Sequence, residues 1–551
     1  MLSVEPSSIW LKKNSNQQCE RIEIHLQEAL LVHEPLEDIL FLKEQVVTLE
    51  KVELLAEVDS FSSGGPLFRV ILTKRLDLHL KKRNHYLPEA SSEKALAEEK
   101  TLFFASADVQ GGIQIKVGLD EFDKFLPSGF LAILASFAQS LGFFDPFLEH
   151  LDFSMKEVKY SMMDKIATLF SSIVVGSSHL QDINHKLTPY RQAASLFGMD
   201  RFPDQSGINR FLNRMGPGEV SQLCLILEII SQKLALFQDE DKVDLNVDAT
   251  GLVVYGDTYQ FAQKGYFPHR RGKKGYQLSL GTTNSEYSQI LSVILDPGNI
   301  PLNLRLWDTI YEVAEVLGSL QRIGIIRADA IYGVGSDIAR LIEEKLSFLI
   351  KGRNPRTARK ILRQFNPSYD DWRRVDETTW AFDVKYTAIK DCPYPVRVVV
   401  TKAINAKGNL DYRHIYTSFS PEEMDEVEVA LSRRKRIDIE AIIRDDKYGL
   451  HIDNLRTKNF WGIWAYLFLA AATHNLISLF RERVLKGTGI EDLGIQTIVK
   501  KLTDIPAKFE KEQGQMRLLF PVGHELARRF VQGKQDNHKG SIFPLEKKLY
   551  N

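Results

Sequence analysis

The order of apolar and polar positions divides the chain into regions with different expected folds. Residues 117–239 carry long apolar stripes at helical spacing, for example in GFLAILASFAQSLGFF and VSQLCLILEIISQKLALF. From Val243 the pattern alternates, with Leu245 and Val247 separated by polar residues, which predicts a strand. The runs GYQLSLGT and YSQILSVILDPGN then predict a hairpin. A helical region therefore precedes a sheet.

Beyond the hairpin, helices and strands alternate. Residues 307–322 have helical periodicity, and the run IGIIRAD predicts a strand that ends at Asp329. A second helix is expected from Ser336, with that serine as its N-cap and Asp337 in its first turn. This alternation predicts a mixed α/β sheet.

The second half of the chain interrupts and then resumes this pattern. Residues 354–417 show short alternating runs with turn residues, which predicts an inserted β subdomain. The apolar segment 460–480 approaches the length of a bilayer span, but it contains His474 and Asn475, so we expect a buried core helix. The first residues lack the apolar stretch of a signal peptide. Near the C-terminal end, the run IPAKFEKEQGQMRLLFPVGHELARRF predicts a hairpin and a short helix.

The length and composition indicate a soluble protein of several domains. The 551 residues are too many for one ordinary core, and 44% are hydrophobic and 26% charged. We expect an N-terminal α+β domain over 1–115, a helical domain over 116–240, an α/β domain over 241–353 and 421–485 with a β insertion over 354–420, and a C-terminal hairpin and helix region over 486–551.

Charge and cysteine content narrow the classes of protein. The chain has 71 basic and 72 acidic residues and a net charge of −1, so any surface that binds nucleic acid must be local. Cys19, Cys224 and Cys392 lie far apart and no pair has zinc-ligand spacing. A reduced, cytoplasmic protein is the simplest inference.

Three acids stand out against this background. Asp248 and Asp329 are predicted at the ends of strands, and Glu440 lies on the predicted helix after the insertion. Carboxylates at strand ends of an open α/β sheet meet at the edge where ligands bind. Three converging carboxylates would repel one another unless cations lay between them, and such ligands suit Mg²⁺ or Mn²⁺. Two such ions could activate a nucleophile and stabilise the leaving oxygen of a phosphodiester.

The stretch RRKRIDIEAIIRDDK surrounds Glu440 with bases. At 100° per residue, one face of the predicted helix carries a single acid in a line of four bases, namely Arg433, Arg436, Glu440, Arg444 and Lys447. A solvated helix with ion pairs between successive turns would explain this pattern. A metal ligand flanked by phosphate-binding bases would explain it as well.

A second basic segment, GYFPHRRGKKGYQ, follows soon after Asp248. Its candidate DNA-binding residues are His269, Arg270, Arg271, Lys273 and Lys274. A flexible basic loop beside a metal site fits contact with a phosphate backbone. A solvated hairpin turn is the alternative.

These segments together resemble a known family, the DDE transposases of bacterial insertion sequences, in the branch with a Tyr–Arg–Glu–Lys helix signature. In that signature the arginine, the glutamate and the lysine have the spacing of Arg436, Glu440 and Lys447. VDATGLVVYG and IIRADAIYG resemble the two aspartate strands, and KNFWGIWAYLFLAAATHNL resembles the helix after the signature. The resemblance covers residues from about Val117 to the C-terminal hairpin.

The resemblance implies a multidomain α/β protein in which a ribonuclease-H-like mixed sheet with an inserted β subdomain is preceded by a helical domain. It also implies DNA cleavage and strand transfer with two Mg²⁺ ions, for which Mn²⁺ would substitute. Asp248, Asp329 and Glu440 would be the catalytic metal ligands, and Arg436 and Lys447 would contact DNA near the scissile phosphate.

The chain departs from the family pattern at two positions. Arg433 stands where the signature has tyrosine, and Ala330 follows the second aspartate where serine is common. Some relatives place an aromatic residue of the insertion against a flipped base. Trp372 and Trp380 are candidates for this role, with a buried core position as the alternative.

The resemblance also sets the expected partners and location. We expect double-stranded DNA, as the terminal inverted repeats of the element and as target, a homodimer on that DNA, no membrane, and a bacterial cytoplasmic location at the nucleoid. Residues 1–115 either recognise the terminal repeats or only fold against the helical domain. A metal-dependent nuclease without strand transfer and an inactive DNA-binding descendant are the alternatives.

Overall fold

The computed structural model describes residues 8–13, 19–25, 54–59, 67–72, 115–120, 127–154, 159–267, 270–405, 407–435, 437–512 and 515–537. The chain separates into two compact units, Met1–Glu98 and Glu99–Asn551. The described part of the smaller unit consists of two antiparallel hairpins, β1 (Ser8–Lys13) with β2 (Cys19–His25) and β3 (Leu54–Asp59) with β4 (Leu67–Leu72).

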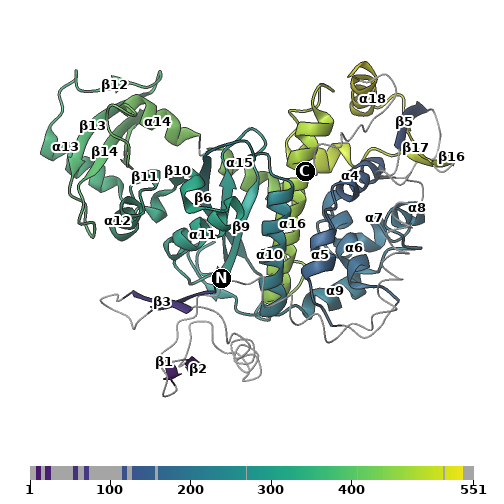
Figure 1. Cartoon of the computed structure of the whole chain (residues 1–551). Coiled ribbons are helices and arrows are strands. Elements are labelled where there is room, and N and C mark those ends of the chain that lie inside the picture. The colour runs from purple at the N-terminus through teal and green to yellow at the C-terminus, as the bar shows by residue number, and fades with distance from the viewer. Residues whose placement is uncertain are drawn as a thin grey trace. The chain divides into compact units, whose positions relative to one another are not determined.

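Helices fill the first part of the larger unit, where the apolar stripes predicted them (Figure 1). Those described are α4 (Gly129–Ser140), α5 (Asp145–His150), α6 (Met162–Val174), α7 (Asp182–Lys186), α8 (Arg191–Ser195), α9 (Gln205–Asn213) and α10 (Pro217–Lys233). The prediction of helix from residue 117 was wrong for its first residues. β5 (Ile115–Asp120) is a strand, because it finds a parallel partner far along the chain in β17 (Gln515–Pro521).

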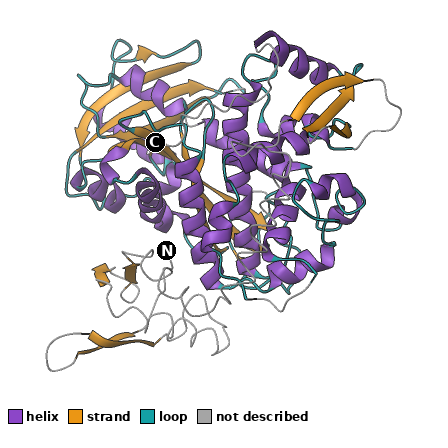
Figure 2. Cartoon of the chain, turned by 45° about the vertical axis from the view of Figure 1, so that its right-hand side comes forward, coloured by secondary structure: helices purple, strands orange, loops and turns teal. Residues whose placement is uncertain are grey.

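The C-terminal region has the predicted hairpin and helix. β16 (Lys508–Glu512) pairs antiparallel with β17, and α18 (Glu525–Asn537) follows. Figure 2 shows this small sheet separate from the large sheet of the same unit.

The large sheet is mixed, as the alternation of strands and helices predicted, and most of its described strand pairs are antiparallel. Its strands are β6 (Val243–Val253), β7 (Gln263–Lys264), β8 (Lys274–Thr283), β9 (Ile290–Pro297), β10 (Ile323–Ala328), β11 (Ser347–Lys351), β12 (Arg373–Arg374), β13 (Thr379–Thr387), β14 (Val396–Ile404) and β15 (Leu410–Thr417). They lie in the order β12-β13-β14-β15-β11-β10-β6-β8-β7, with β9 also on β8. Only β10 is parallel to its neighbours, β6 and β11, among the described pairs of this sheet.

The strands of the predicted insertion continue this sheet instead of forming one of their own. β15 pairs antiparallel with β11, with Leu349 opposite Thr417. The insertion also begins with a helix, α13 (Pro355–Phe365), where we expected strands, because Asn354 caps it and Pro355 occupies its first turn. The β insertion and the α/β region are therefore built on one continuous set of backbone hydrogen bonds.

The remaining helices lie between the strands of this sheet in the sequence or follow its last strand. They are η2 (Leu302–Arg305), α11 (Leu306–Leu317), η3 (Leu320–Arg322), η4 (Ala330–Tyr332), α12 (Gly335–Glu343), α14 (Glu426–Arg434), α15 (Ile437–Asp445), η5 (Asp446–Leu450), α16 (Phe460–Phe480), η6 (Arg481–Leu485), α17 (Ile495–Thr497) and η7 (Ile498–Leu502). Ser336 is not the N-cap of α12. The helix begins one residue earlier, at Gly335, where a side chain would collide with the Lys390 carbonyl, and Asp337 lies in the first turn as predicted.

Helix α16 joins the helical region to the sheet. It packs against α10, α6, α9 and β9, and every one of its 21 residues is buried. By length and composition, the helical stretch Phe460–Leu485 could cross a membrane, but its most apolar part is enclosed by the rest of the protein. The prediction of a buried core helix is confirmed.

Candidate active site

The register of two parallel strands places Asp248 beside Asp329. Ala328 of β10 is paired with Val247 of β6, and the residue that follows each of them in the sequence is an aspartate. Parallel neighbours lie about 4.8 Å apart and paired residues project to the same face of a sheet. The sequence suggested that Asp248 ends its strand. This was wrong, because β6 continues to Val253 along β8. It lies where the parallel neighbour of β6 ends.

The same face carries a row of paired charges. Arg327, two residues before Asp329, is 1% exposed and donates to the Asp244 carboxylate at 2.8 Å. Its guanidinium also donates to the backbone carbonyl of Ser432 at 2.9 Å and to the hydroxyl of that serine at 3.0 Å. Arg327 thus fixes the end of α14 over this face of the sheet.

Two cationic side chains lie beside the Asp329 carboxylate. Arg433, next to Ser432, lies 3.4 Å from the Asp329 carboxylate, and Lys351 at the end of β11 lies 3.3 Å from the same oxygen. Arg433 is therefore an ion-pair partner of Asp329. Lys351 was missed in the sequence, although it ends a strand at the same edge of the sheet.

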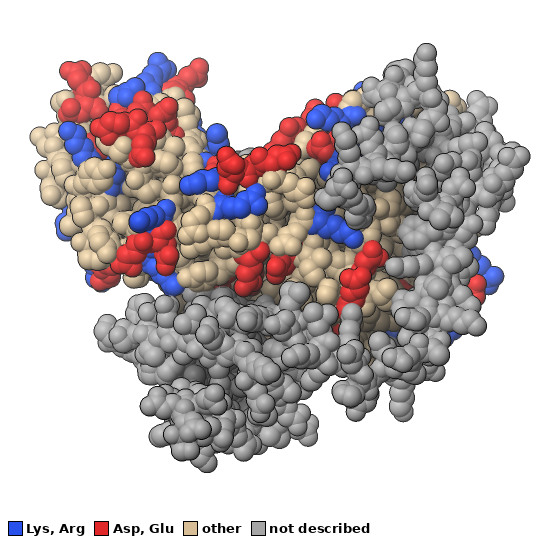
Figure 3. All heavy atoms as spheres, in the orientation of Figure 1, with Lys and Arg blue, Asp and Glu red and all other residues tan. Residues whose placement is uncertain are grey.

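Glu440 lies on α15, which packs against β6. Its side chain is exposed. Among the described residues, no three His, Cys, Asp or Glu side chains are close enough together to hold a metal ion. The donor chemistry of Asp248 and Asp329 fits a hard divalent cation, but the structure does not group Glu440 with them. In Figure 3 the surface is hollowed where α15 lies, with acidic and basic side chains bordering the hollow.

The basic stretch around Glu440 forms two helices where we expected one. Arg433 lies in the last turn of α14, Glu440 belongs to α15, and Arg436 between them lies outside the described residues. After α15 the chain widens into the π-helical turn η5, which contains Lys447. The single stripe of bases is therefore broken at both ends.

Lys447 is directed towards the first aspartate. Its ammonium donates to the hydroxyl of Thr250, two residues after Asp248 on β6. Burial lowers the pKa of Lys447, and the nearby charges of Asp453 and Asp248 oppose that shift. Lys447 thus places a positive charge beside the carboxylate edge.

A buried side-chain contact between His474 and Asp446 fixes the turn that carries Lys447. His474 of α16 faces the Asp446 carboxylate at 2.8 Å through Nδ1 and the Ser288 carbonyl at 3.1 Å through Nε2. The imidazole thus joins η5 to the loop between β8 and β9. Asn475 hydrogen-bonds the backbone of Ile290 through both its oxygen and its nitrogen. The His–Asn pair of the sequence therefore anchors α16 and η5 to the sheet.

The basic loop after β7 lies at the end of the long hairpin of β6 and β8, with Val253 opposite Gly275. Arg270 donates to the hydroxyl of Tyr255, and Lys273 lies 5.7 Å from the centre of the same ring. Lys274 pairs with Asp257 at 3.0 Å. Arg271 is exposed, and His269 lies outside the described residues.

The tryptophans of the insertion contact other residues of the insertion. Trp372 lies 5.6 Å from the ring of Phe382 and 6.5 Å from that of Tyr412, and it packs against the core. The Lys402 ammonium lies 4.2 Å from the Trp372 ring and 5.3 Å from the Trp380 ring. For Trp372 these contacts support the core position rather than a free aromatic surface.

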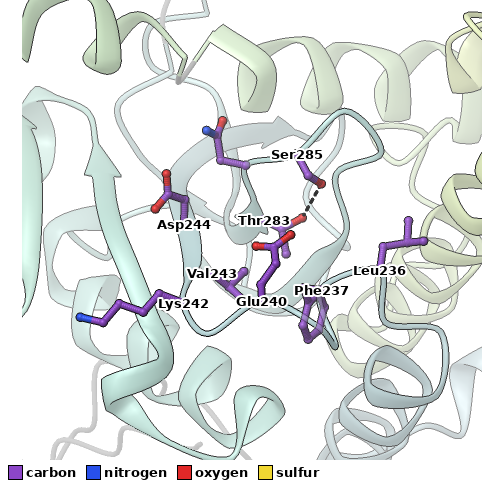
Figure 4. A pocket seen from close by; sticks show the side chains of 9 residues that line it. Leu236, Phe237, Glu240, Lys242, Val243, Asp244, Thr283 and Ser285 are labelled. Carbon is purple, nitrogen blue, oxygen red and sulfur yellow. Dashed lines mark hydrogen bonds between the residues drawn. The ribbon is translucent and has the colours of Figure 1, made fainter. Parts of the chain in front are cut away.

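A small pocket lies near the start of β6, away from Asp248. Its volume is about 260 Å³, and Glu240, Lys242 and Asp244 are among its lining residues (Figure 4). Because Asp244 is four residues before Asp248 along the strand, the pocket is not part of the carboxylate edge.

Comparison with known proteins identifies the family. A model described as Transposase DDE domain group 1 matches residues 128–536. The chain belongs to this family. A DDE transposase domain is that of an enzyme that cleaves and moves DNA, so DNA is the substrate class of the chain.

One solved structure similar to this DDE transposase is a piggyBac transposase synaptic complex with hairpin DNA. The identity is 12%, the match covers 76% of this chain and 83% of that chain, and the TM-score is 0.39. No curated protein matches the chain.

Proposed function

We propose that this chain is an active transposase of a bacterial insertion sequence, of the branch with the Tyr–Arg–Glu–Lys signature, that cuts the ends of its own element and joins them to target DNA. The proposal includes a ribonuclease-H-like catalytic domain over 241–353 and 421–485, a homodimer on the DNA and a cytoplasmic location. The observation that carries it is the placement of Asp248 and Asp329 side by side on one face of the sheet.

In this proposal the carboxylates bind divalent cations and the bases hold the DNA. Asp248, Asp329 and Glu440 supply oxygen ligands for two Mg²⁺ ions, or Mn²⁺ in their place. When bound, such ions lower the pKa of a water or hydroxyl nucleophile and stabilise the leaving oxygen. Glu440, on the helix α15 that packs against β6, would be the third ligand. Lys447 orients the phosphate beside Asp248, and Arg436 and the loop of Arg270 and Arg271 hold the flanking backbone.

The DNA that flanks the gene is the substrate for the decisive experiment, since the ends of an element lie beside its own reading frame. The purified protein is incubated with this DNA in Mg²⁺ or in Ca²⁺, and every new end is sequenced. We expect discrete cuts on both sides of the gene in Mg²⁺ only. The cuts should disappear in Glu440→Gln and persist in Glu344→Gln, a matched change at another exposed glutamate.

The products separate the alternatives. Ends joined to a second DNA molecule are expected from a transposase, whereas cuts without joining would establish the nuclease. Binding without cuts in either metal would establish an inactive descendant. A solution mass with bound end DNA that corresponds to one chain would contradict the dimer.

A further inference from the structure

Helix α13 has an apolar face and an entirely basic face. Ala358 and Ile361 are buried in the core and Leu362 packs against it. The opposite face, at spacings of three and four residues, carries exposed bases. With Arg353 just before the helix, these bases are Arg353, Arg356, Arg359, Lys360 and Arg363.

Within the described part of the chain, these five side chains have no ion pair, side-chain hydrogen bond or ring contact. No Asp or Glu occurs between Gly352 and Tyr369. A basic helix that serves only solubility usually alternates its charges and pairs them between turns. Here the positive charges are left uncompensated, and they repel one another unless an anionic partner binds.

The helix begins at the edge of the sheet that carries the aspartates. β11 runs parallel to β10, with Ala328 opposite Ile350, so Lys351 at the end of β11 lies beside Asp329, which directly follows β10. The ion pair of Lys351 and Asp329 at 3.3 Å shows the same alignment. Only Gly352, Arg353 and Asn354 separate Lys351 from α13. From there the helix runs over β15, on the outer side of the insertion (Figure 1).

We propose that the basic face of α13 is a binding surface for the phosphate backbone of duplex DNA, which it holds to one side of the carboxylate edge. The inference rests on the proposed function, in which DNA binds beside Asp329. Arg356 to Arg363 spans about 10 Å at 1.5 Å per residue, and a duplex carries about six phosphate charges over that length. A row of bases without base-edge geometry binds irrespective of sequence, so this surface sets affinity and orientation and not the choice of site.

The test measures binding of the full chain to a random-sequence 30-base-pair duplex as salt is raised. The variant R356Q/R359Q/K360Q/R363Q removes the charges while keeping long, polar side chains. Each phosphate contact contributes about 0.9 to the slope of log affinity against log salt. We expect the slope to fall by about 2 to 3 and the affinity at 0.1 M salt to fall at least 10-fold.

Two further variants separate contact from other effects. K159Q/R191Q/R210Q/R528Q removes the same number of exposed charges elsewhere, and its slope should stay within 1 of the wild type. R356K/R359K/R363K keeps the charge of the helix and should retain the wild-type slope. If the four-glutamine variant of α13 keeps the wild-type slope, the proposal is wrong, and an acidic protein surface becomes the partner class to examine.

The proposed function and this inference fail in different ways. If the wild-type chain shows no salt-dependent binding to any duplex, both are wrong. If the wild type cuts flanking DNA in Mg²⁺ and the α13 variant binds as tightly as the wild type, only the role of α13 is wrong.

Discussion

Two basic segments border the acidic edge of the sheet, and they differ in what their side chains contact. In residues 433–447, Arg433 pairs with Asp329 and Lys447 donates to Thr250 beside Asp248. Arg353 and the four bases of α13 contact no described polar or aromatic side chain. The first segment is arranged by the fold around the carboxylates, whereas the second leaves its charges available. Basic residues therefore differ in role with their contacts. Those of residues 433–447 contact the residues around the two aspartates, whereas those of α13 are exposed to bind an anionic partner.

The largest effect should follow from the carboxylate that the first segment surrounds. Asp248→Asn keeps the shape of the side chain but removes its charge as a metal ligand. Because a metal site supplies several kcal/mol of transition-state stabilisation, we expect DNA cleavage to fall by at least about 10³-fold. Binding to the random duplex should change less than twofold, since α13 is untouched. Cleavage in Mg²⁺ at more than a tenth of the wild-type rate would refute the metal site.

The second prediction compares how firmly the two segments are built into the fold. His474→Ala leaves the buried Asp446 carboxylate without its partner below Lys447. Because a buried polar group loses its hydrogen-bond partner and the missing ring leaves a cavity, we expect a loss of about 3–5 kcal/mol in the free energy of unfolding, measured with urea. Lys360→Ala on α13 should cost less than about 0.5 kcal/mol, because its side chain is exposed. Equal losses in the two variants would contradict the distinction.

The third prediction concerns the residues that lead into α13. His414 is 1% exposed, and its ring fills the space beside Gly352, where a Cβ would meet it. Burial lowers the pKa of His414 to about 4. The unfolded chain binds a proton at this imidazole near pH 6.5, whereas the folded chain binds it only near pH 4. The stability that the neutral His414 ring contributes is therefore complete above pH 6.5 and is lost as the pH falls towards 4.

The expected loss through His414 is about 2–3 kcal/mol between pH 7 and pH 4. Urea unfolding of the wild type and of His414→Gln at both pH values isolates this contribution from that of the carboxylates. The difference between the two proteins should shrink as the pH falls. A constant difference would show that His414 does not titrate in this range.

The smallest effect is expected at Arg433, the ion-pair partner of Asp329. Its charge at 3.4 Å from Asp329 competes with a cation for the same carboxylate. A partly exposed pair contributes at most about 1 kcal/mol, so Arg433→Gln should lower the Mg²⁺ concentration for half-maximal cleavage by up to about fivefold. The change Arg434→Gln, which removes the neighbouring pair with Asp376, is the control. An increase in the Mg²⁺ requirement would instead show that Arg433 supports metal binding.

The sequence predicted the parts of this arrangement that depend on local periodicity. Alternation identified β6, the hairpin of β8 and β9, and β10, and apolar content identified α16 as a core helix. The pairing of β15 with β11 and of β17 with β5 joins residues far apart in the chain, and such contacts leave no local pattern. The insertion therefore appeared from its sequence to be a separate subdomain.

The candidate site shows the same division. Asp248 and Asp329 were predictable because Asp248 lies within, and Asp329 directly after, a strand with a clear pattern. The contact of Arg433 with Asp329 was not, since it depends on Arg327 holding the end of α14 through Ser432. Likewise, the π-helical turn that carries Lys447 depends on the buried pair of Asp446 and His474. Tertiary contacts of this kind override a helical stripe drawn from spacing alone.

The pairing of β10 with β6 also has a consequence for how the gene tolerates mutation. Neighbouring residues of a strand project to opposite faces, so the loss of one codon within either strand would turn its aspartate away from the other. The apolar residues of that strand would turn outward at the same time. Substitutions within these strands should therefore be recovered far more often than single-codon deletions among functional descendants of the element.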